Sequence, residues 1–138
     1  MSSREFQRME LQKALFEPTL VRSAPHIVRW WESRRLFYNI VVGTTGLGTL
    51  AVGALASVVS KGQIQGPPWQ LPFVYGIAAN IFFTFGWGIE LVVERWMKRP
   101  IYGFGPALFR HGLVFAIGLT ALPAVMMMFG AIMSRIFG

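Results

Sequence analysis

The 138-residue chain contains no cysteine, which excludes disulfide bonds and thiolate ligation of metals. It also lacks any charged residue in the 25 residues from Leu36 to Ser60. A helix of that length is roughly 37 Å long, enough to cross a hydrocarbon core of about 30 Å. Because helices buried in soluble proteins are seldom this long and apolar on every face, the stretch predicts a membrane span.

The chain also lacks room for a sizeable domain outside a membrane. Two further apolar stretches, about 71–93 and 107–133, follow the first at 36–60, and 54% of the residues are hydrophobic. We therefore predict an all-α integral membrane protein with three transmembrane helices in residues 36–138. Residues 1–35 are predicted to form an N-terminal arm that contains amphipathic and interfacial helix.

The basic residues do not form a nucleic-acid patch. Seven of the 13 lie before residue 36, beside the first span, where anionic lipids of a membrane surface are the expected partner. The second loop carries three more, whereas the first loop and the C-terminal end carry one each. Positive charge stays on the cytoplasmic side, so we expect a cytoplasmic N-terminus and an outward-facing C-terminus.

Residues 1–17 are predicted to form a short polar helix that ends before Pro18, since proline cannot continue a helix. Its amphipathicity is moderate, and two interpretations stay open: a solvated tail, or a helix lying on a neighbouring subunit or on headgroups. A second helix start is predicted at Ser23, with Pro25 in the first turn.

Aromatic and arginine side chains are then mixed just before the first span, as in Trp30, Trp31, Arg34 and Arg35. Such mixtures are typical of membrane interfaces, where rings lie at headgroup level and guanidinium groups reach phosphate. The segment WWESRRLFYN resembles the lead-in of small bacterial inner-membrane proteins. The resemblance implies a bacterial cytoplasmic membrane and no particular activity.

Small residues recur every four positions in the first span, at Thr45, Thr49, Gly53 and Ser57. Helices in bilayers associate where small side chains allow close backbone contact, so this face should meet another helix. In the second span, Asn80 should bond across helices, because an unpaired amide in hydrocarbon costs several kcal/mol.

The second span also carries an aromatic side, which predicts a surface for lipids or pigments. The residues assigned to it are Phe73, Phe82, Phe83, Phe85 and Trp87.

Two charged residues lie inside the predicted spans without local partners. Glu90 and Arg110 each stand ten residues from Pro100, so an antiparallel hairpin would bring them to similar depth, and we predict an ion pair. His111, with Gly112 beside it, is a possible tetrapyrrole ligand, although an ordinary interfacial histidine explains it more simply.

Three functional classes fit these observations. An enzyme would have to rely on Glu90, Glu94, Arg110 and His111, which lie near one interface, and a channel or carrier would need more polar groups along its path. An accessory subunit needs only packing faces, an interfacial segment and an arm. We therefore expect a non-enzymatic subunit that packs against other membrane subunits, and a respiratory or photosynthetic complex is a common setting for such chains.

Overall fold

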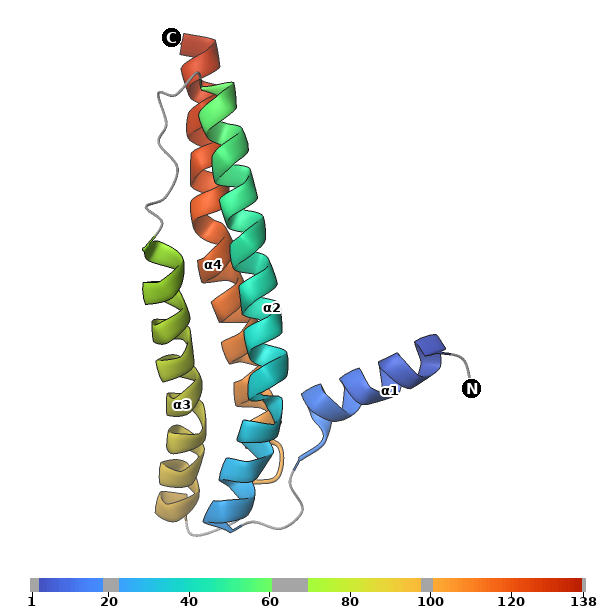
Figure 1. Cartoon of the computed structure of the whole chain (residues 1–138). Helices are drawn as coiled ribbons and strands as arrows, with labels where there is room; N and C mark the ends of the chain where they lie inside the picture. The colour runs from blue at the N-terminus through green and yellow to red at the C-terminus, as the bar shows by residue number, and fades with distance from the viewer. Residues whose placement is uncertain (1–2, 19–22, 61–69, 98–100, 138) are drawn as a thin grey trace. The chain divides into compact units, whose positions relative to one another are not determined.

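The computed structural model describes residues 3–18, 23–60, 70–97 and 101–137, and these residues form four helices with no strand among them. In chain order they are α1 (Ser3–Phe16), α2 (Ala24–Val59), α3 (Leu71–Met97) and α4 (Phe104–Phe137), as labelled in Figure 1. The all-α prediction is confirmed.

Three of these helices are long and apolar enough to cross a membrane: Ala24–Val59, Pro72–Met97 and Phe104–Phe137. The predicted spans are therefore confirmed, but each helix extends beyond its apolar stretch. Most notably, α2 begins at Ala24, so the aromatic and arginine segment and the first span form one continuous helix. The helix does not need to break at the interface, because arginine and tryptophan side chains can reach headgroups from a regular helix.

The start of α2 follows the predicted signal. The Ser23 carbonyl accepts hydrogen bonds from the backbone N–H groups of His26 (2.9 Å) and Ile27 (3.0 Å), and Ser23 Oγ lies 2.7 Å from His26 Nδ1. Ser23 thus occupies the position that precedes the first helical residue. The helix α1 ends at Phe16, before Pro18, as expected.

The chain divides into two compact units, and each unit contains part of each of the three long helices. Unit 1 comprises Met1–Tyr38 and Ile81–Leu113, and unit 2 comprises Asn39–Asn80 and Val114–Gly138. The core of unit 1 is aromatic and large, made by Ile27, Trp31, Tyr38, Phe83, Phe109 and Leu113. Its rings meet mostly edge to face, for example Trp31 and Phe109 at 5.7 Å and 78°.

The core of unit 2 is built from small side chains. Ala56 and Ala131 are fully buried, and Ala79 and Ala116 are 8% exposed. Alanines at such positions let helix backbones approach closely, which drives association where lipid tails are as apolar as the side chains. The small-residue pattern of the sequence therefore describes this unit better than unit 1.

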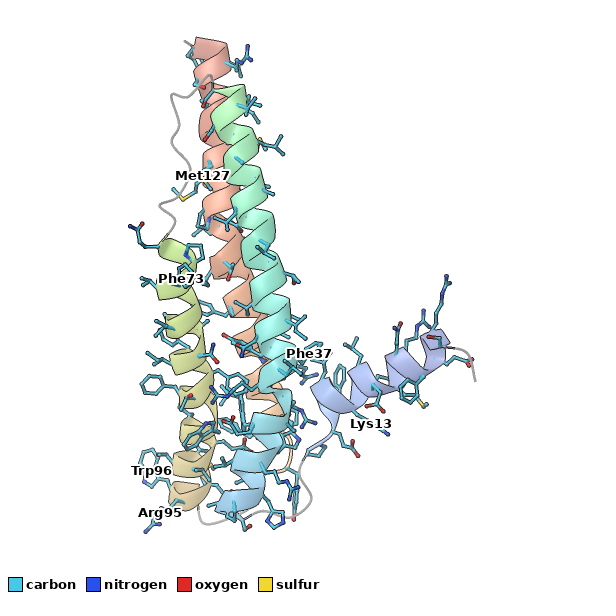
Figure 2. All side chains as sticks on the ribbon, viewed as in Figure 1. Lys13, Phe37, Phe73, Arg95, Trp96 and Met127 are labelled. Carbon is cyan, nitrogen blue, oxygen red and sulfur yellow. The ribbon has the colours of Figure 1, made fainter. Side chains whose placement is uncertain are left out.

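Outward-facing side chains of the long helices are mainly apolar. Phe73, Phe82, Phe85 and Trp96 are 59–84% exposed, and Figure 2 labels Phe73 and Trp96 among them. Phe83 was assigned to the same surface, and that prediction is wrong, because this side chain is 4% exposed and lies in the unit 1 core. Helical rotation places Phe83 about 100° from its neighbour Phe82, which turns it inward.

Candidate functional site

The centre of unit 1 is a hydrogen bond between two buried side chains. Trp31 Nε1 donates to Glu90 Oε2 at 2.6 Å, with Trp31 3% and Glu90 2% exposed. The rings of Phe83 and Phe109 lie 5.5 Å and 5.7 Å from the Trp31 ring. In an apolar site a polar group without a partner is costly, so this bond holds α2 and α3 in one register.

Two glycines give this pair its room. A Cβ placed on Gly86 would lie 2.7 Å from Trp31 Cη2 and Cζ3, and one placed on Gly105 would lie 2.5 Å from Glu90 Oε2. Neither position can carry a side chain without displacing the pair. The backbones of α3 and α4 therefore form walls against the indole ring and the carboxyl group.

Arg110 does not form the ion pair with Glu90 that the sequence predicted. Its guanidinium lies over the ring of Phe16, 4.6 Å from the centroid, and its Nε donates to the Pro106 carbonyl at 3.3 Å. The hairpin argument placed the two residues at similar depth but not at the same rotation about their helix axes. Trp31 of α2 meets the Glu90 carboxyl instead.

A second cluster holds the C-terminal end of α1 against the rest of unit 1. Arg34 Nη2 donates to the Lys13 carbonyl at 2.9 Å, and Trp30 Nε1 donates to the Glu17 carbonyl at 2.8 Å. The last carbonyls of a helix lack donors within it, and they carry partial negative charge that favours cations. Arg34 adds a second donor to the Lys13 carbonyl, which also accepts from the Glu17 N–H at 3.2 Å. Trp30 bonds the residue that follows the helix, so the end of the arm is joined to α2.

Stacking strengthens the same cluster. The Arg34 guanidinium lies 3.8 Å from the centroid of the Trp30 ring, and Arg110 covers Phe16 from α4. We name Phe16, Trp30, Arg34 and Arg110 the arm dock. The sequence suggested Trp30, Arg34 and Arg110 as interface residues, and the structure assigns all three to one junction, together with Phe16.

The neighbouring Arg35 contacts side chains of α2 and α3. It forms a salt bridge with Glu32 at 2.7 Å, donates to Thr84 Oγ1 at 3.2 Å and lies 4.9 Å from the Phe83 ring centroid. Glu32 and Arg35 stand three residues apart in the helix, a spacing at which opposite charges can pair.

A groove of about 720 Å³ runs between α1 and the first part of α2. Phe6, Leu11 and Phe37 supply its apolar walls, and charged side chains of both signs surround them. Figure 2 shows Phe37 on the side of α2 that faces α1. The groove and the arm dock together define the candidate interaction site of unit 1.

In unit 2 the predicted stripe on the first span contacts α4 through Thr49. Thr49 Oγ1 donates to the Thr120 carbonyl at 2.8 Å, and Gly53 is buried on the same face. Ser57 is half-buried one turn later, whereas Thr45 donates to Val41 O at 2.8 Å within its own helix. Thr49 therefore contacts α4, as the prediction for this face requires, whereas contacts of the other three residues with a second helix stay a prediction.

Asn80 and its surroundings form the second candidate site. Asn80 Nδ2 donates to the Gly76 carbonyl at 3.0 Å, one turn earlier in α3. Both residues line a cavity of about 390 Å³ with Tyr75 and Thr120, whose hydroxyl oxygens are 2.9 Å apart. The sequence singled out Asn80 and Thr49 here but gave no sign of a cavity, since voids depend on how helices pack.

His111 and Gly112 lie on the exposed side of α4. His111 Nδ1 is 2.7 Å from the Ala107 carbonyl oxygen and donates its proton to it, since a carbonyl oxygen can only accept. A Cβ on Gly112 would meet no atom within 4 Å. Ligation of a tetrapyrrole by His111 stays a prediction. Among the residues that the structure describes, no group of three or more His, Cys, Asp or Glu could hold a metal ion.

The chain was compared with protein-family models, with curated proteins and with solved structures. No model of a protein family matches the chain, no curated protein matches it, and no solved structure matches it.

Proposed function

We propose that this chain is a non-catalytic accessory subunit of a larger complex in a bacterial cytoplasmic membrane, and that α1 contacts a neighbouring subunit. The arm dock supports this proposal. It fixes the final turn of α1. Phe6 and Leu11, which lie nearer the N-terminal end of this helix, are 53% and 47% exposed. An arm that is held at one end and exposes large apolar side chains elsewhere is suited to a second contact.

The pattern on α1 favours a protein partner over a lipid surface. Phe6 and Leu11 lie about 140° apart around the helix, whereas a helix lying on headgroups concentrates its apolar side chains on one face. The groove adds a concave surface whose rim carries Arg4, Arg8 and Glu10. A mixed-sign rim around an apolar centre is typical of protein interfaces.

Orientation and lipid contact belong to the same proposal. The excess of positive charge near the N-terminus supports a cytoplasmic arm, with exposed Arg29 available to anionic headgroups. Because the chain has no cysteine, Ser3→Cys and Ser134→Cys would each introduce a single thiol. In intact cells a membrane-impermeant maleimide should label only the Ser134→Cys variant. Labelling of Ser3→Cys alone would reverse the topology.

The partner contact is tested by truncating the apolar side chains of the arm. The double variant Phe6→Ala/Leu11→Ala should insert normally and lose the stoichiometric partner subunits that the unaltered chain retains in mild detergent. Phe73→Ala is the matched control, because Phe73 is 67% exposed on a span and lies outside the groove. Purification of the unaltered chain as a stable monomer, or identical partners for both variants, would contradict the proposal.

A further inference from the structure

Unit 2 contains a narrow cavity between α2, α3 and α4, with a volume of about 390 Å³. On α2 it is lined by Asn39, Gly43, Gly46 and Leu50, which recur every three or four residues and so share one face of the helix. Ligand sites in proteins commonly have volumes of about 300–1,000 Å³. The cavity is therefore large enough for a small lipid or part of a larger one.

The length of the cavity suits an apolar chain. Its lining extends from Asn39 to Leu50, which corresponds to about 16 Å along α2. Glycine widens the cavity on two sides: a Cβ on Gly43 or on Gly76 would meet no atom within 4 Å.

The polar groups on the lining differ in whether their hydrogen-bonding capacity is unused. The hydroxyls of Thr120 and Tyr75 use theirs: Thr120 donates to the Ala116 carbonyl oxygen at 2.6 Å, and its own oxygen, 2.9 Å from the Tyr75 hydroxyl, can accept the Tyr75 proton. Good O–H···O bonds are about 2.5–3.0 Å long, so both hydroxyl protons have acceptors within the protein. The Asn39 amide makes no hydrogen bond to the residues that the structure describes.

The lining also indicates the charge of the occupant. Its polar side chains are the amides of Asn39 and Asn80 and the hydroxyls of Thr49, Tyr75 and Thr120, with no charged side chain among the lining residues that the structure describes. A charged headgroup would thus lack a counter-ion in an apolar site, which is costly. N–H and O–H donors in hydrocarbon are instead satisfied by neutral carbonyl oxygens.

We propose that the unit 2 cavity binds a neutral lipid that has one apolar chain and a carbonyl-bearing end. Its chain lies along Gly43 and Gly46, and its carbonyl accepts a hydrogen bond from the Asn39 amide. Lateral entry is open, because Asn39 and Leu47 line the cavity and are exposed, Leu47 by 68%. This inference does not depend on the proposed subunit role, since it rests on unit 2 and the arm belongs to unit 1.

Photocrosslinking of the full chain tests the site directly. The chain is reconstituted in nanodiscs of saturated phosphatidylcholine and titrated with a monoacylglycerol whose acyl chain carries a diazirine. We expect saturable labelling that maps to peptides of α2 and α3 around the cavity. Three unlabelled competitors are used: decylubiquinone, which carries quinone carbonyls, monoolein, which carries an ester carbonyl, and hexadecane, which carries none.

Two variants separate a built site from general lipid contact. Gly46→Leu should abolish saturable labelling, because a Cβ at this position lies 3.8 Å from Thr120 Cγ2, within the lining. Gly48→Leu is the matched control, since this exposed position lies outside the lining. Asn39→Leu replaces the amide by an apolar group of similar size and should weaken labelling about five- to tenfold. Circular dichroism verifies that each variant is folded.

Each result decides the proposal. Competition by both carbonyl compounds supports the class as stated, and competition by one of them supports the class and identifies its source as ester or quinone. Non-saturable labelling, equal labelling of Gly46→Leu and Gly48→Leu, or competition by hexadecane as strong as by monoolein would overturn it. Loss of partner subunits through changes in α1 would leave all these outcomes unaltered.

Discussion

The contact between Gly86 and Trp31 makes a sharp test of how unit 1 is held together. Replacing Gly86 by alanine places a methyl group 2.7 Å from two atoms of the Trp31 ring, well inside van der Waals contact. Trp31 cannot retreat easily, because it is 3% exposed, packs on Phe109 and donates to Glu90. The strain must therefore move a helix or break the hydrogen bond.

Two opposing effects set the magnitude. Overpacking a well-filled core costs about 1–3 kcal/mol, while replacing glycine by alanine inside a helix favours the helix by about 1 kcal/mol. We thus expect Gly86→Ala to destabilise the protein by about 0–2 kcal/mol. Gly88→Ala on the same helix isolates the second effect, because a Cβ there would meet nothing within 4 Å.

A double-mutant cycle separates the contact from everything else. Trp31→Phe removes the benzo ring atoms that approach Gly86, so the added methyl group should lose its clash in that background. Gly86→Ala should then behave like Gly88→Ala, with a coupling energy of about 1–3 kcal/mol between positions 31 and 86. The cost of losing the bond to Glu90 cancels in the cycle, since it is present in both Trp31→Phe variants.

The free energy of unfolding can be measured by titration with sodium dodecyl sulfate in mixed micelles, followed by far-ultraviolet circular dichroism. If Gly86→Ala changes stability equally with tryptophan or phenylalanine at position 31, the close approach of α3 to the indole ring does not exist. The same conclusion follows if Gly86→Ala and Gly88→Ala have identical effects in the unaltered chain.

Three further predictions concern the arm, unit 2 and the exposed histidine. Arg34→Lys keeps the charge but loses the planar group that reaches the Lys13 carbonyl, so limited proteolysis of the arm should accelerate several-fold, whereas Arg29→Lys at an exposed position should leave it unaltered. Thr49→Val removes the hydrogen bond to the α4 backbone and should lower the free energy of unfolding by about 1 kcal/mol. Thr44→Val is the control and should change it little, because the hydrogen bonds that the Thr44 hydroxyl donates stay within α2. Equal losses in the two variants would contradict this role of Thr49. His111→Leu should leave the absorption spectrum of the purified protein as it was, and disappearance of a Soret or chlorophyll band would establish His111 as a ligand.

Length and hydropathy were enough to determine the three spans, and a local sequence signal determined the start of α2. A charge-free run must reach across hydrocarbon at 1.5 Å per residue, and Ser23 with Pro25 supplies a local start signal. The sequence also indicated that the face of Thr49 and Gly53 meets another helix, because small residues at four-residue spacing form a continuous strip. These are properties of one helix, which its own residues set.

Rotation and contact between helices were decided only by tertiary packing. Equal depth suggested Arg110 as the partner of Glu90, but the rotation that Gly86 and Gly105 permit presents the carboxyl to Trp31. The same holds for Phe83, which enters the core although its neighbours face outward. The unit 2 cavity was invisible in the sequence for the related reason that a void is the volume three packed helices leave unfilled, and no single helix encodes it.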